Sequence, residues 1–372
     1  MTEKGGFGYG VTCNCADVFT VSQGRCFGVL RGDSIMEETG KKRYTIDDVA
    51  RELGISKTTV SRAISGKGRI SQATREKVLA CVERNDYRPN VVAQGLAQRR
   101  TYNIGLLLLT DYTDIDFPFF KECMSGICAK AAQHNYDIII SMIDGKDFTQ
   151  LQRLIANRKV DGVIVTRVLV NSSVRHYLKE KNVPFVAIGT PDVEEPGLVW
   201  IDNQNREGSR ELTGILLMKG LRHLALLGGS RAHLVTKSRL QGYEDAHGDY
   251  RVHLDDSLVF MEMDSYAKVA KAADQILESG ADGIVCMDDI ITNMLLGCLR
   301  ERRVEIPRDI RVASLYDSAL LEYYIPAVTS LHFNTKSLGM NACQLLLEQL
   351  GEKVDGEFVP LNYQVILRES TK

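Results

Sequence analysis

The chain has 372 residues, of which 44% are hydrophobic and 25% are charged, and its formal net charge at pH 7 is −2. No apolar run approaches the roughly 20 residues that a membrane-spanning helix needs, and the first residues contain no apolar segment of signal-peptide length. Length and composition therefore predict a cytoplasmic globular protein of two or three domains without membrane association.

Residues 1–43 are rich in Gly and polar residues and show no sustained hydrophobic period. We expect this segment to be disordered, or to be an extension in front of the natural start of the protein. Met36 begins the segment MEETGKKRYTIDDVA and is the candidate natural start.

Three short helices are predicted in the next region, residues 44–89, which Pro89 ends. Thr45 is expected to cap the first helix, with Asp48 completing a capping box and Gly54 forming the turn that ends it. Ser56 and Ser71 are expected to cap the second and third helices. The predicted buried faces are Ile46, Val49, Ala50 and Leu53 in the first helix, Val60, Ala63 and Ile64 in the second, and Val78, Leu79 and Val82 in the third.

A helix, a tight turn with Gly and a second helix with an exposed polar face are typical of a helix-turn-helix, whose second helix enters the major groove of DNA. In the segment GISKTTVSR, the predicted exposed face holds Lys57, Thr58, Ser61 and Arg62, which are able to reach base edges and phosphates. The alternative is a three-helix protein-interaction module with a solvated charged face.

Positive charge is concentrated in the same part of the chain. Residues 41–103 hold 14 Lys and Arg against 6 Asp and Glu, a net +8, whereas residues 104–372 hold 29 against 37, a net −8. A basic region followed by an acidic one indicates a polyanionic partner for the basic region alone. The charge therefore favours DNA over the interaction module.

Residues 103–372 alternate short apolar strands with helices. The first predicted strand, NIGLLLLT, is apolar throughout, as parallel strands covered on both faces are. Two such blocks predict an α/β region with two doubly wound, Rossmann-like lobes, similar to periplasmic binding proteins, and a cleft between them. Strands are expected at 103–110, 136–143, 162–167, 184–189, 223–229, 258–262, 283–289, 311–317 and 358–367, helices at 118–134, 149–158, 173–181, 205–218, 236–247, 266–279, 290–301 and 335–350, and a crossing segment at 198–203.

Neither the cysteines nor the motifs of the chain indicate a metal centre or an enzyme. The nine cysteines lack the CxxC spacing of disulfide frameworks and zinc sites. The sequence contains no P-loop, GxSxG or HExxH, and no GxGxxG after the first strand, so we expect no catalytic residues, no metal and no cofactor. Six cysteines among apolar residues are expected to be buried: Cys81, Cys123, Cys128, Cys286, Cys298 and Cys343.

From about Tyr44 to its end, the chain resembles the lactose/galactose repressor family of bacterial transcription regulators. The resemblance is carried by the motifs DVA…GIS…TVSR, ISQATREKV and YRPN…A..L. It implies that Lys57, Thr58 and Arg62 occupy base-reading positions, and Arg62 is suited to donate two hydrogen bonds to a guanine. The positions at which the family contacts phosphates or orients the reading helix are Thr45, Ser56, Thr59, Ser61, Tyr87 and Asn90, with capping as the expected main role of Thr45 and Ser56.

Residues 90–102 match the hinge helix and linker of the family. In the family the hinge folds only against its dimer partner on DNA. The resemblance makes Ala93 and Leu96 DNA contacts, with Leu96 as a wedge between base pairs in the minor groove. The alternative for Leu96 is ordinary packing on a lobe. Gly95 departs from the commoner polar residue of that helix and lowers its helix propensity.

In the family the two lobes form the effector sensor and the dimer interface. Arg239 matches an effector-contacting arginine, which suits bidentate binding of oxygens, and Asp288 matches a position that faces the ligand. Tyr316 and Asp317 stand where the family has an acidic pair, so the first acidic residue of that pair is absent. Gly189 replaces another acidic ligand contact, and two missing carboxylates argue against a plain hexose or galactoside. Two further polar residues are candidates both for ligand contacts and for helix caps: Asn203 and Asp289.

The resemblance thus implies a sequence-specific DNA-binding transcriptional regulator, most simply a repressor, whose operator affinity is controlled by a small molecule such as a sugar or sugar derivative. Its expected partners are double-stranded operator DNA with an inverted repeat, this effector and a second copy of the chain in a homodimer. Such a protein is expected in the bacterial cytoplasm, at the nucleoid when bound to DNA. The other two candidate functions are a solute sensor without a DNA role, which the basic region argues against, and a carbohydrate-processing enzyme, which the missing catalytic motifs argue against.

Overall fold

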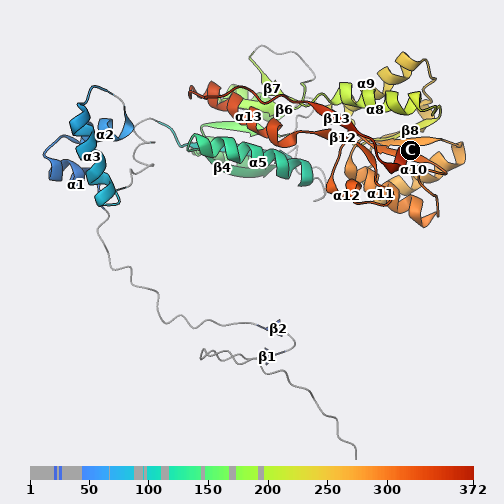
Figure 1. Cartoon of the computed structure of the whole chain (residues 1–372), viewed down its shortest axis with the longest axis horizontal. Helices are drawn as coiled ribbons and strands as arrows, with labels where there is room; N and C mark the ends of the chain where they lie inside the picture. Colours follow the sequence, from blue (N-terminus) through green and yellow to red (C-terminus); the bar gives the residue numbers. More distant parts are fainter. Residues whose placement is uncertain are drawn as a thin grey trace, which may run out of the picture. The chain divides into compact units, whose positions relative to one another are not determined.

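The computed structural model describes residues 21–22, 25–26, 44–66, 68–87, 95, 99–109, 117–143, 147–166, 173–191 and 197–372. The chain forms two compact units, Met1–Val91 and Val92–Lys372 (Figure 1). We refer to residues 44–87 of the first unit as the head and to the second unit as the body. Across the described ranges, no helix has the length and apolar character that crossing a bilayer requires.

The head contains the three predicted helices, and their ends lie at the predicted capping residues. The Thr45 hydroxyl and the Asp48 carboxylate accept each other's backbone N–H groups, which completes the predicted capping box. Gly54 ends the first helix with φ 65°, a left-handed conformation that glycine adopts without strain. Ser56 and Ser71 cap the next two helices through the backbone N–H groups three residues on. The helices are α1 (Ile46–Leu53), α2 (Lys57–Ser65) and α3 (Gln72–Arg84).

One apolar cluster holds the head together, and it differs from the predicted core at one position of α3. Leu79 was predicted to face inward but is 45% exposed. Because Val78 and Cys81 lie three residues apart on the face of α3 that packs against the other two helices, Leu79 points away from the core. The buried members of the cluster are Val49, Ala50, Val60, Ala63, Val78, Cys81 and Tyr87.

The N-terminal lobe of the body is a five-stranded parallel sheet in the order β4-β3-β5-β6-β7. The predicted crossing segment at 198–203 contains β7, which pairs with β6 as the edge strand of this sheet. The strands are β3 (Asn103–Leu109), β4 (Asp137–Ile143), β5 (Gly162–Val165), β6 (Phe185–Ile188) and β7 (Val199–Ile201). The helices are α5 (Phe117–Gln133), α6 (Thr149–Ala156), α7 (Ser173–Glu180) and α13 (Thr335–Gln349).

The C-terminal lobe is a six-stranded sheet in the order β13-β12-β11-β10-β8-β9, in which only β13 pairs antiparallel to its neighbour. β12 was not predicted from the sequence. The strands are β8 (Leu224–Leu227), β9 (Val259–Phe260), β10 (Gly283–Cys286), β11 (Arg311–Ser314), β12 (Thr329–Phe333) and β13 (Tyr363–Ile366). The helices are α8 (Asn205–Met218), α9 (Leu234–Tyr250), α10 (Tyr266–Ser279), α11 (Asp289–Glu301) and the short α12 (Ala319–Glu322).

The central strands of both sheets are covered on both faces, as their apolar sequences predict. All four residues of each of β5, β6, β8 and β10 are buried. Separate apolar clusters lie on the two faces of each sheet, and α5 and α13 cover the same face of the N-terminal lobe (Figure 1). These two helices approach closely at Gly126 and Gly339, where an added Cβ would lie 2.0 Å from a backbone carbonyl oxygen of the other helix.

Two other features depart from the sequence predictions. Two-residue strands, β1 (Val21–Ser22) and β2 (Arg25–Cys26), pair antiparallel in the segment ahead of the head. Cys128 is exposed, whereas the other five cysteines predicted to be buried are buried. The buried stripe of α5 runs through Cys123, Ile127 and Ala131 at intervals of four residues, so position 128 lies beside it on the outer face.

His247 makes the stability of the body depend on pH. The side chain is 3% exposed, and its Nδ1 lies 2.9 Å from the carbonyl oxygen of Tyr243. Burial lowers the pKa of His247 from 6.5, although this hydrogen bond opposes the shift. The unfolded chain therefore takes up a proton near pH 6.5 that the folded chain takes up only at lower pH. The contribution of His247 to the free energy of unfolding therefore falls as the pH drops from 6.5 towards the folded pKa.

We expect calorimetry to give a lower Tm near pH 5.5 than near pH 7.5, with a smaller difference for His247→Gln. The control is His253→Gln, which changes an exposed histidine. Burial raises the pKa of Asp202, so this residue contributes to the pH dependence of stability with the opposite sign. The test of His247 is therefore the difference in the pH dependence of Tm between His247→Gln and His253→Gln. An unchanged pH dependence in His247→Gln would contradict the assignment.

Candidate DNA-contact surface and effector cavity

The exposed face of α2 carries the side chains predicted to read DNA. Lys57, Thr58, Ser61 and Arg62 are all exposed, while Val60 on the opposite face is fully buried. The helix alternates in this way because its apolar residues are held by α1 and α3. A row of basic and hydroxyl groups on one solvent-facing side of a helix is the arrangement that major-groove recognition requires.

Two of these side chains are oriented by neighbours. The Lys57 ammonium lies 2.5 Å from the Asp47 carboxylate at the start of α1, and both side chains remain largely exposed. Such a pair contributes little to stability, so DNA phosphate can displace Asp47 at small cost. The stem of Arg62 passes over Gly68, where an added Cβ would lie 3.2 Å from Arg62 Cδ. Gly68 has φ 89°, so the turn beneath Arg62 favours glycine.

The remaining predicted contacts of the head separate into caps and a packed residue. Thr45 and Ser56 both cap helices, as expected, and Thr59 donates its backbone N–H to the Ser56 hydroxyl at 3.1 Å. Tyr87 is 8% exposed and packs in the core of the head, where burial raises its pKa. Its position suits an orienting role better than a phosphate contact. Three predicted contacts lie outside the described residues: Asn90, Ala93 and Leu96.

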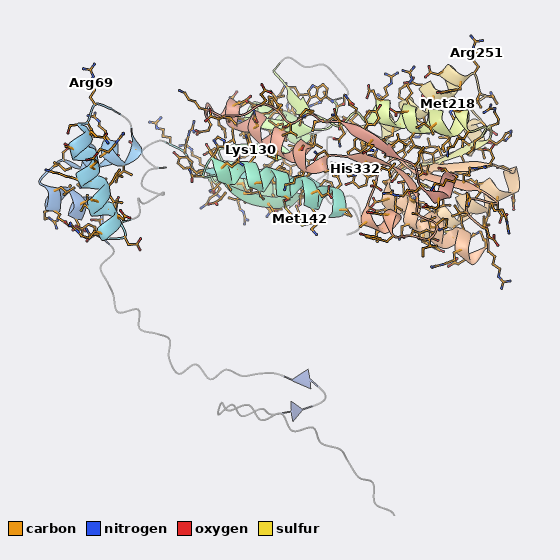
Figure 2. The ribbon with its side chains drawn as sticks, viewed as in Figure 1. Arg69, Lys130, Met142, Met218, Arg251 and His332 are labelled. Carbon is orange, nitrogen blue, oxygen red and sulfur yellow. The ribbon has the colours of Figure 1, made fainter. Side chains whose placement is uncertain are left out.

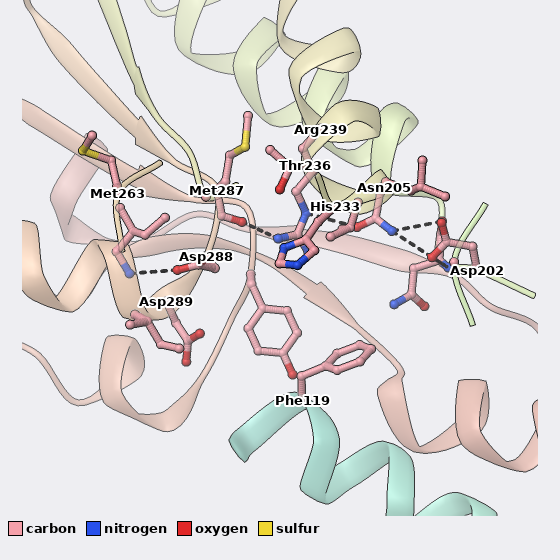
Figure 3. Close-up of a pocket in the computed structure, with 18 of the residues that line it drawn as sticks. Phe119, Asp202, Asn205, His233, Thr236, Arg239, Met263, Met287, Asp288 and Asp289 are labelled. Atoms are coloured by element: carbon pink, nitrogen blue, oxygen red, sulfur yellow. Dashed lines mark hydrogen bonds between the residues drawn. The ribbon is translucent and has the colours of Figure 1, made fainter. Parts of the chain in front are cut away.

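The body contains a cavity of about 140 Å³ at the carboxyl ends of the strands of both sheets (Figure 3). Thr166 follows β5, Gly189 follows β6 and Asp202 follows β7 in the N-terminal lobe. Gly229, Met287 and Tyr316 follow strands of the C-terminal lobe. Ligands of doubly wound proteins bind at this edge, because the strands themselves are buried and only the loops beyond them are accessible. The cavity is therefore the candidate effector site.

A chain of hydrogen bonds crosses the cavity from one lobe to the other (Figure 3). Thr190 donates its backbone N–H to Asp202 at 3.0 Å, and Asn205 donates its amide N–H to the same carboxylate at 3.0 Å. Arg239 Nε donates to Asn205 Oδ1 at 3.1 Å. A second guanidinium nitrogen of Arg239 donates to the carbonyl oxygen of Met287. Arg239 is 9% exposed and is thus fixed by groups from two separate segments.

The charges in the cavity are unevenly distributed. Burial raises the pKa of Asp202, while hydrogen bonds from Thr190 and Asn203 and the charge of Arg239 oppose the rise. Among the lining residues, four carry carboxylates and one carries a guanidinium. An anionic ligand would therefore meet a site with an excess of negative charge. The four acidic residues are Asp202, Asp264, Asp288 and Asp289.

The structure brings three of the four predicted effector residues together and separates the fourth from them. Arg239, Asp288 and Tyr316 all line the cavity. Asp288 also caps α11, since its carboxylate accepts the backbone N–H of Ile291 at 2.8 Å. The buried Tyr316 ring packs edge-on against Phe119 of α5, with ring centroids 6.0 Å apart, and burial raises the pKa of its phenol.

Asp317 lies outside the set of residues that line the cavity. Its carboxylate accepts hydrogen bonds from Arg368 at 2.7 Å and from the Ser330 hydroxyl at 2.5 Å. Burial would raise the pKa of Asp317, but these two donors lower it overall. Asp317 thus joins the end of β11 to β12 and to the segment after β13, and these contacts stabilise the C-terminal lobe rather than line the cavity.

Sequence reasoning missed several polar residues of the cavity. Asp202, Asn205 and His233 were not predicted, although the polar run DNQN directly follows the apolar residues LVWI and is a usable signal for the first two. Asn203 and Asp289, predicted as caps or ligand contacts, both line the cavity. Neither is a cap, because the caps of α8 and α11 are the residues that precede these helices, Gln204 and Asp288.

Comparison with known proteins finds a family match in each of the two units. Residues 45–90 match the family described as bacterial regulatory proteins, lacI family, and residues 213–371 match the periplasmic binding protein-like domain. The HTH-type transcriptional regulator RegA of Clostridium saccharobutylicum is 29% identical over 336 residues, which cover 88% of this chain and 99% of RegA. Catabolite control protein A of Staphylococcus epidermidis is 26% identical over 331 residues, which cover 88% of this chain and 99% of that protein.

Solved structures agree with this relationship. A transcriptional regulator CelR–cellobiose complex is 26% identical with a TM-score of 0.65, and the match covers 88% of this chain and 100% of that chain. The lac repressor dimer bound to operator and the anti-inducer ONPF has a TM-score of 0.71 at 23% identity, covering 89% and 99%, and supports the fold. The match of residues 45–90 makes the head a DNA-binding domain of the lacI family of bacterial regulatory proteins, and the body carries a periplasmic binding protein-like domain. Together with the matches to whole regulators, these two domains show that the chain is a DNA-binding transcriptional regulator rather than an enzyme.

Proposed function

We propose that this protein binds an inverted-repeat operator as a homodimer, and that an uncharged carbohydrate or carbohydrate derivative in the body cavity changes its operator affinity. The observation that carries the proposal is the exposed face of α2, where Lys57, Thr58, Ser61 and Arg62 lie on the side opposite the core of the head. Arg62 reads a guanine in each half-site, and Lys57 and Thr58 determine the neighbouring base pairs.

The composition of the cavity supports a carbohydrate effector. Asp202, Asn205 and Arg239 offer hydrogen-bond donors and acceptors, which suit a ligand rich in hydroxyl groups. Phe119 and Ile188 add apolar surface, against which the C–H face of a sugar ring can pack. A relative with a similar structure, CelR, was solved as a cellobiose complex. The excess of carboxylates disfavours phosphorylated sugars.

Apolar side chains on the surface of the body support the homodimer. Met142 and Ile140 on the edge strand β4 are 55% and 46% exposed, and Tyr323 and Ile325 beyond α12 are 78% and 91% exposed. Met142 and α12 both lie along the lower edge of the body in the common view of Figures 1 and 2. Large exposed apolar groups on one edge are typical of a self-association surface.

We expect Met142→Asp to weaken the dimer, because a carboxylate would then be buried against the partner. Sedimentation velocity over a concentration series measures the change. The matched control is Met218→Asp, since Met218 on α8 is 63% exposed but lies on the upper edge of the body in Figure 2. Equal dissociation by both variants, or by neither, would argue against this interface.

Selection from random DNA with the full chain is expected to recover an inverted repeat whose half-sites lie about one helical turn apart. Arg62→Ala should cost about 1–3 kcal/mol of binding free energy and relax the preference at one base pair per half-site. Lys77→Ala removes the same charge from the exposed surface of α3 and should leave the base preference unchanged. Recovery of an asymmetric motif, or of none, would refute the proposed operator.

A thermal-shift screen of free sugars, sugar phosphates and nucleobases is expected to yield a free sugar or derivative that raises Tm, since ligands of the native state stabilise it by mass action. Arg239→Ala should abolish this shift while leaving operator affinity largely unchanged. Arg231→Ala, at an exposed position nearby, is the matched control. A larger Tm shift with a phosphorylated sugar, or an unchanged shift in Arg239→Ala, would contradict the proposed site.

A further inference from the structure

The segment where the body begins is held by a cluster of polar contacts centred on Arg100. One guanidinium nitrogen of Arg100 donates to the Tyr136 hydroxyl at 3.2 Å and to the Glu352 carboxylate, and the other donates to the carbonyl oxygen of Leu350. Tyr136 in turn donates its hydroxyl to Glu352 at 3.3 Å. The Arg100 and Glu352 side chains are only 29% and 27% exposed, so this pair is shielded more than a surface ion pair.

A second set of contacts fixes the backbone next to Arg100. Asp161 accepts the backbone N–H groups of Thr101 at 2.7 Å and of Tyr102 at 2.9 Å, together with the Thr101 hydroxyl at 2.9 Å. Arg99 and Tyr102 have φ 56° and 55°, a left-handed conformation that is unfavourable for residues with a side chain. Such strain persists only where the surroundings impose it, and it concentrates in clamps and switch regions.

Gly95 fits directly against this structure. The backbone N–H of Arg100 donates to the Gly95 carbonyl oxygen at 2.9 Å. A Cβ added at Gly95 would lie 2.4 Å from the Arg100 carbonyl oxygen, a distance that no side chain tolerates without a shift of the backbone. Glycine is therefore required at this position by the lack of room for a Cβ, despite its low helix propensity.

We propose that Gly95, Arg100, Tyr136, Asp161 and Glu352 form a linker clamp whose residues position the segment before it for operator recognition. Binding of the head at a specific site restricts the freedom of the chain that leads to the body, and this restriction costs conformational entropy. A clamp that fixes one end before DNA arrives reduces this cost, which is the effect of preorganisation. Binding to random DNA depends on charge alone, so it does not require that the clamp fix this end of the segment.

Two variants of the full chain test the clamp against simpler expectations. Helix propensity predicts that Gly95→Ala tightens operator binding, by about fivefold. Electrostatics predicts that Glu352→Gln, which removes a negative charge, tightens it as well. The clamp predicts the reverse: both variants bind the selected operator about tenfold or more weakly, as expected when preorganisation is lost, and bind random-sequence DNA with nearly unchanged affinity.

Glu348→Gln is the matched control, because it removes the same charge from an exposed position at the end of α13. Calorimetry of each variant shows whether a loss of operator affinity comes from a loss of stability. Tyr136→Phe is a milder variant, which removes only one hydroxyl from the cluster and should also weaken operator binding. Operator affinity equal to or above that of the unchanged chain in Gly95→Ala and Glu352→Gln would overturn the clamp. Equal weakening for operator and random DNA would overturn it too.

The inference rests on the proposed operator recognition, and the two fail differently. If the chain recognises no operator, selection with the unchanged protein recovers no motif. If only the clamp is wrong, the unchanged protein recovers a motif and the variants bind it equally well. Combining Arg100→Ala with Glu352→Gln adds a further check, since residues that act as a unit give effects on operator affinity that are not additive.

Discussion

The architecture of the body depends on one constraint, the burial of its parallel strands on both faces. Every residue of β5, β6, β8 and β10 is buried, so the side chains along these strands serve the core and are not available to a ligand. Recognition is therefore confined to the first residues beyond the strands, where the chain turns towards a helix. Residues such as Thr166, Met287 and Tyr316 lie at such positions, and the cavity forms where these ends from two sheets meet.

The sequence predicts those features that depend on local patterns. The caps Thr45, Ser56 and Ser71 and the alternating strands and helices follow from spacing alone. β12 was missed because its five residues include Thr, Ser and His, and its burial comes from pairing with β11 and β13. Likewise, Asp317 pairs with Arg368, 51 residues away, and no local pattern reveals this contact. Asp202 and Asn205 escaped prediction because residues 198–203 were predicted as a crossing segment, so the polar residues after β7 were not recognised as following a strand.

α13 connects the two lobes of the body. It begins directly after β12 of the C-terminal sheet, and it packs on α5 so closely at Gly339 that the two helices contact through their backbones. Interfaces of this kind resist sliding, since any shift brings backbone atoms into collision. α13 and α5 therefore form one closely packed layer of the N-terminal lobe, and the short connection between β12 and α13 is one place where a change in lobe arrangement can be accommodated. Leu350 and Glu352, which hold Arg100, lie at the other end of this helix.

The close contact between Gly95 and Arg100 also limits where recombination can join the head of one such regulator to the body of another. By sequence Gly95 belongs to the hinge, but its fit depends on the Arg100 carbonyl and thus on the body. A natural recombinant or an engineered chimera that takes its head from another regulator keeps this fit when the crossover lies upstream of Gly95, near the boundary at Val91. A crossover between Gly95 and Arg100 brings in the residue that the other regulator has at position 95. A side chain at that position has no room beside the Arg100 carbonyl oxygen. Gly95 must therefore be inherited together with the body that it fits.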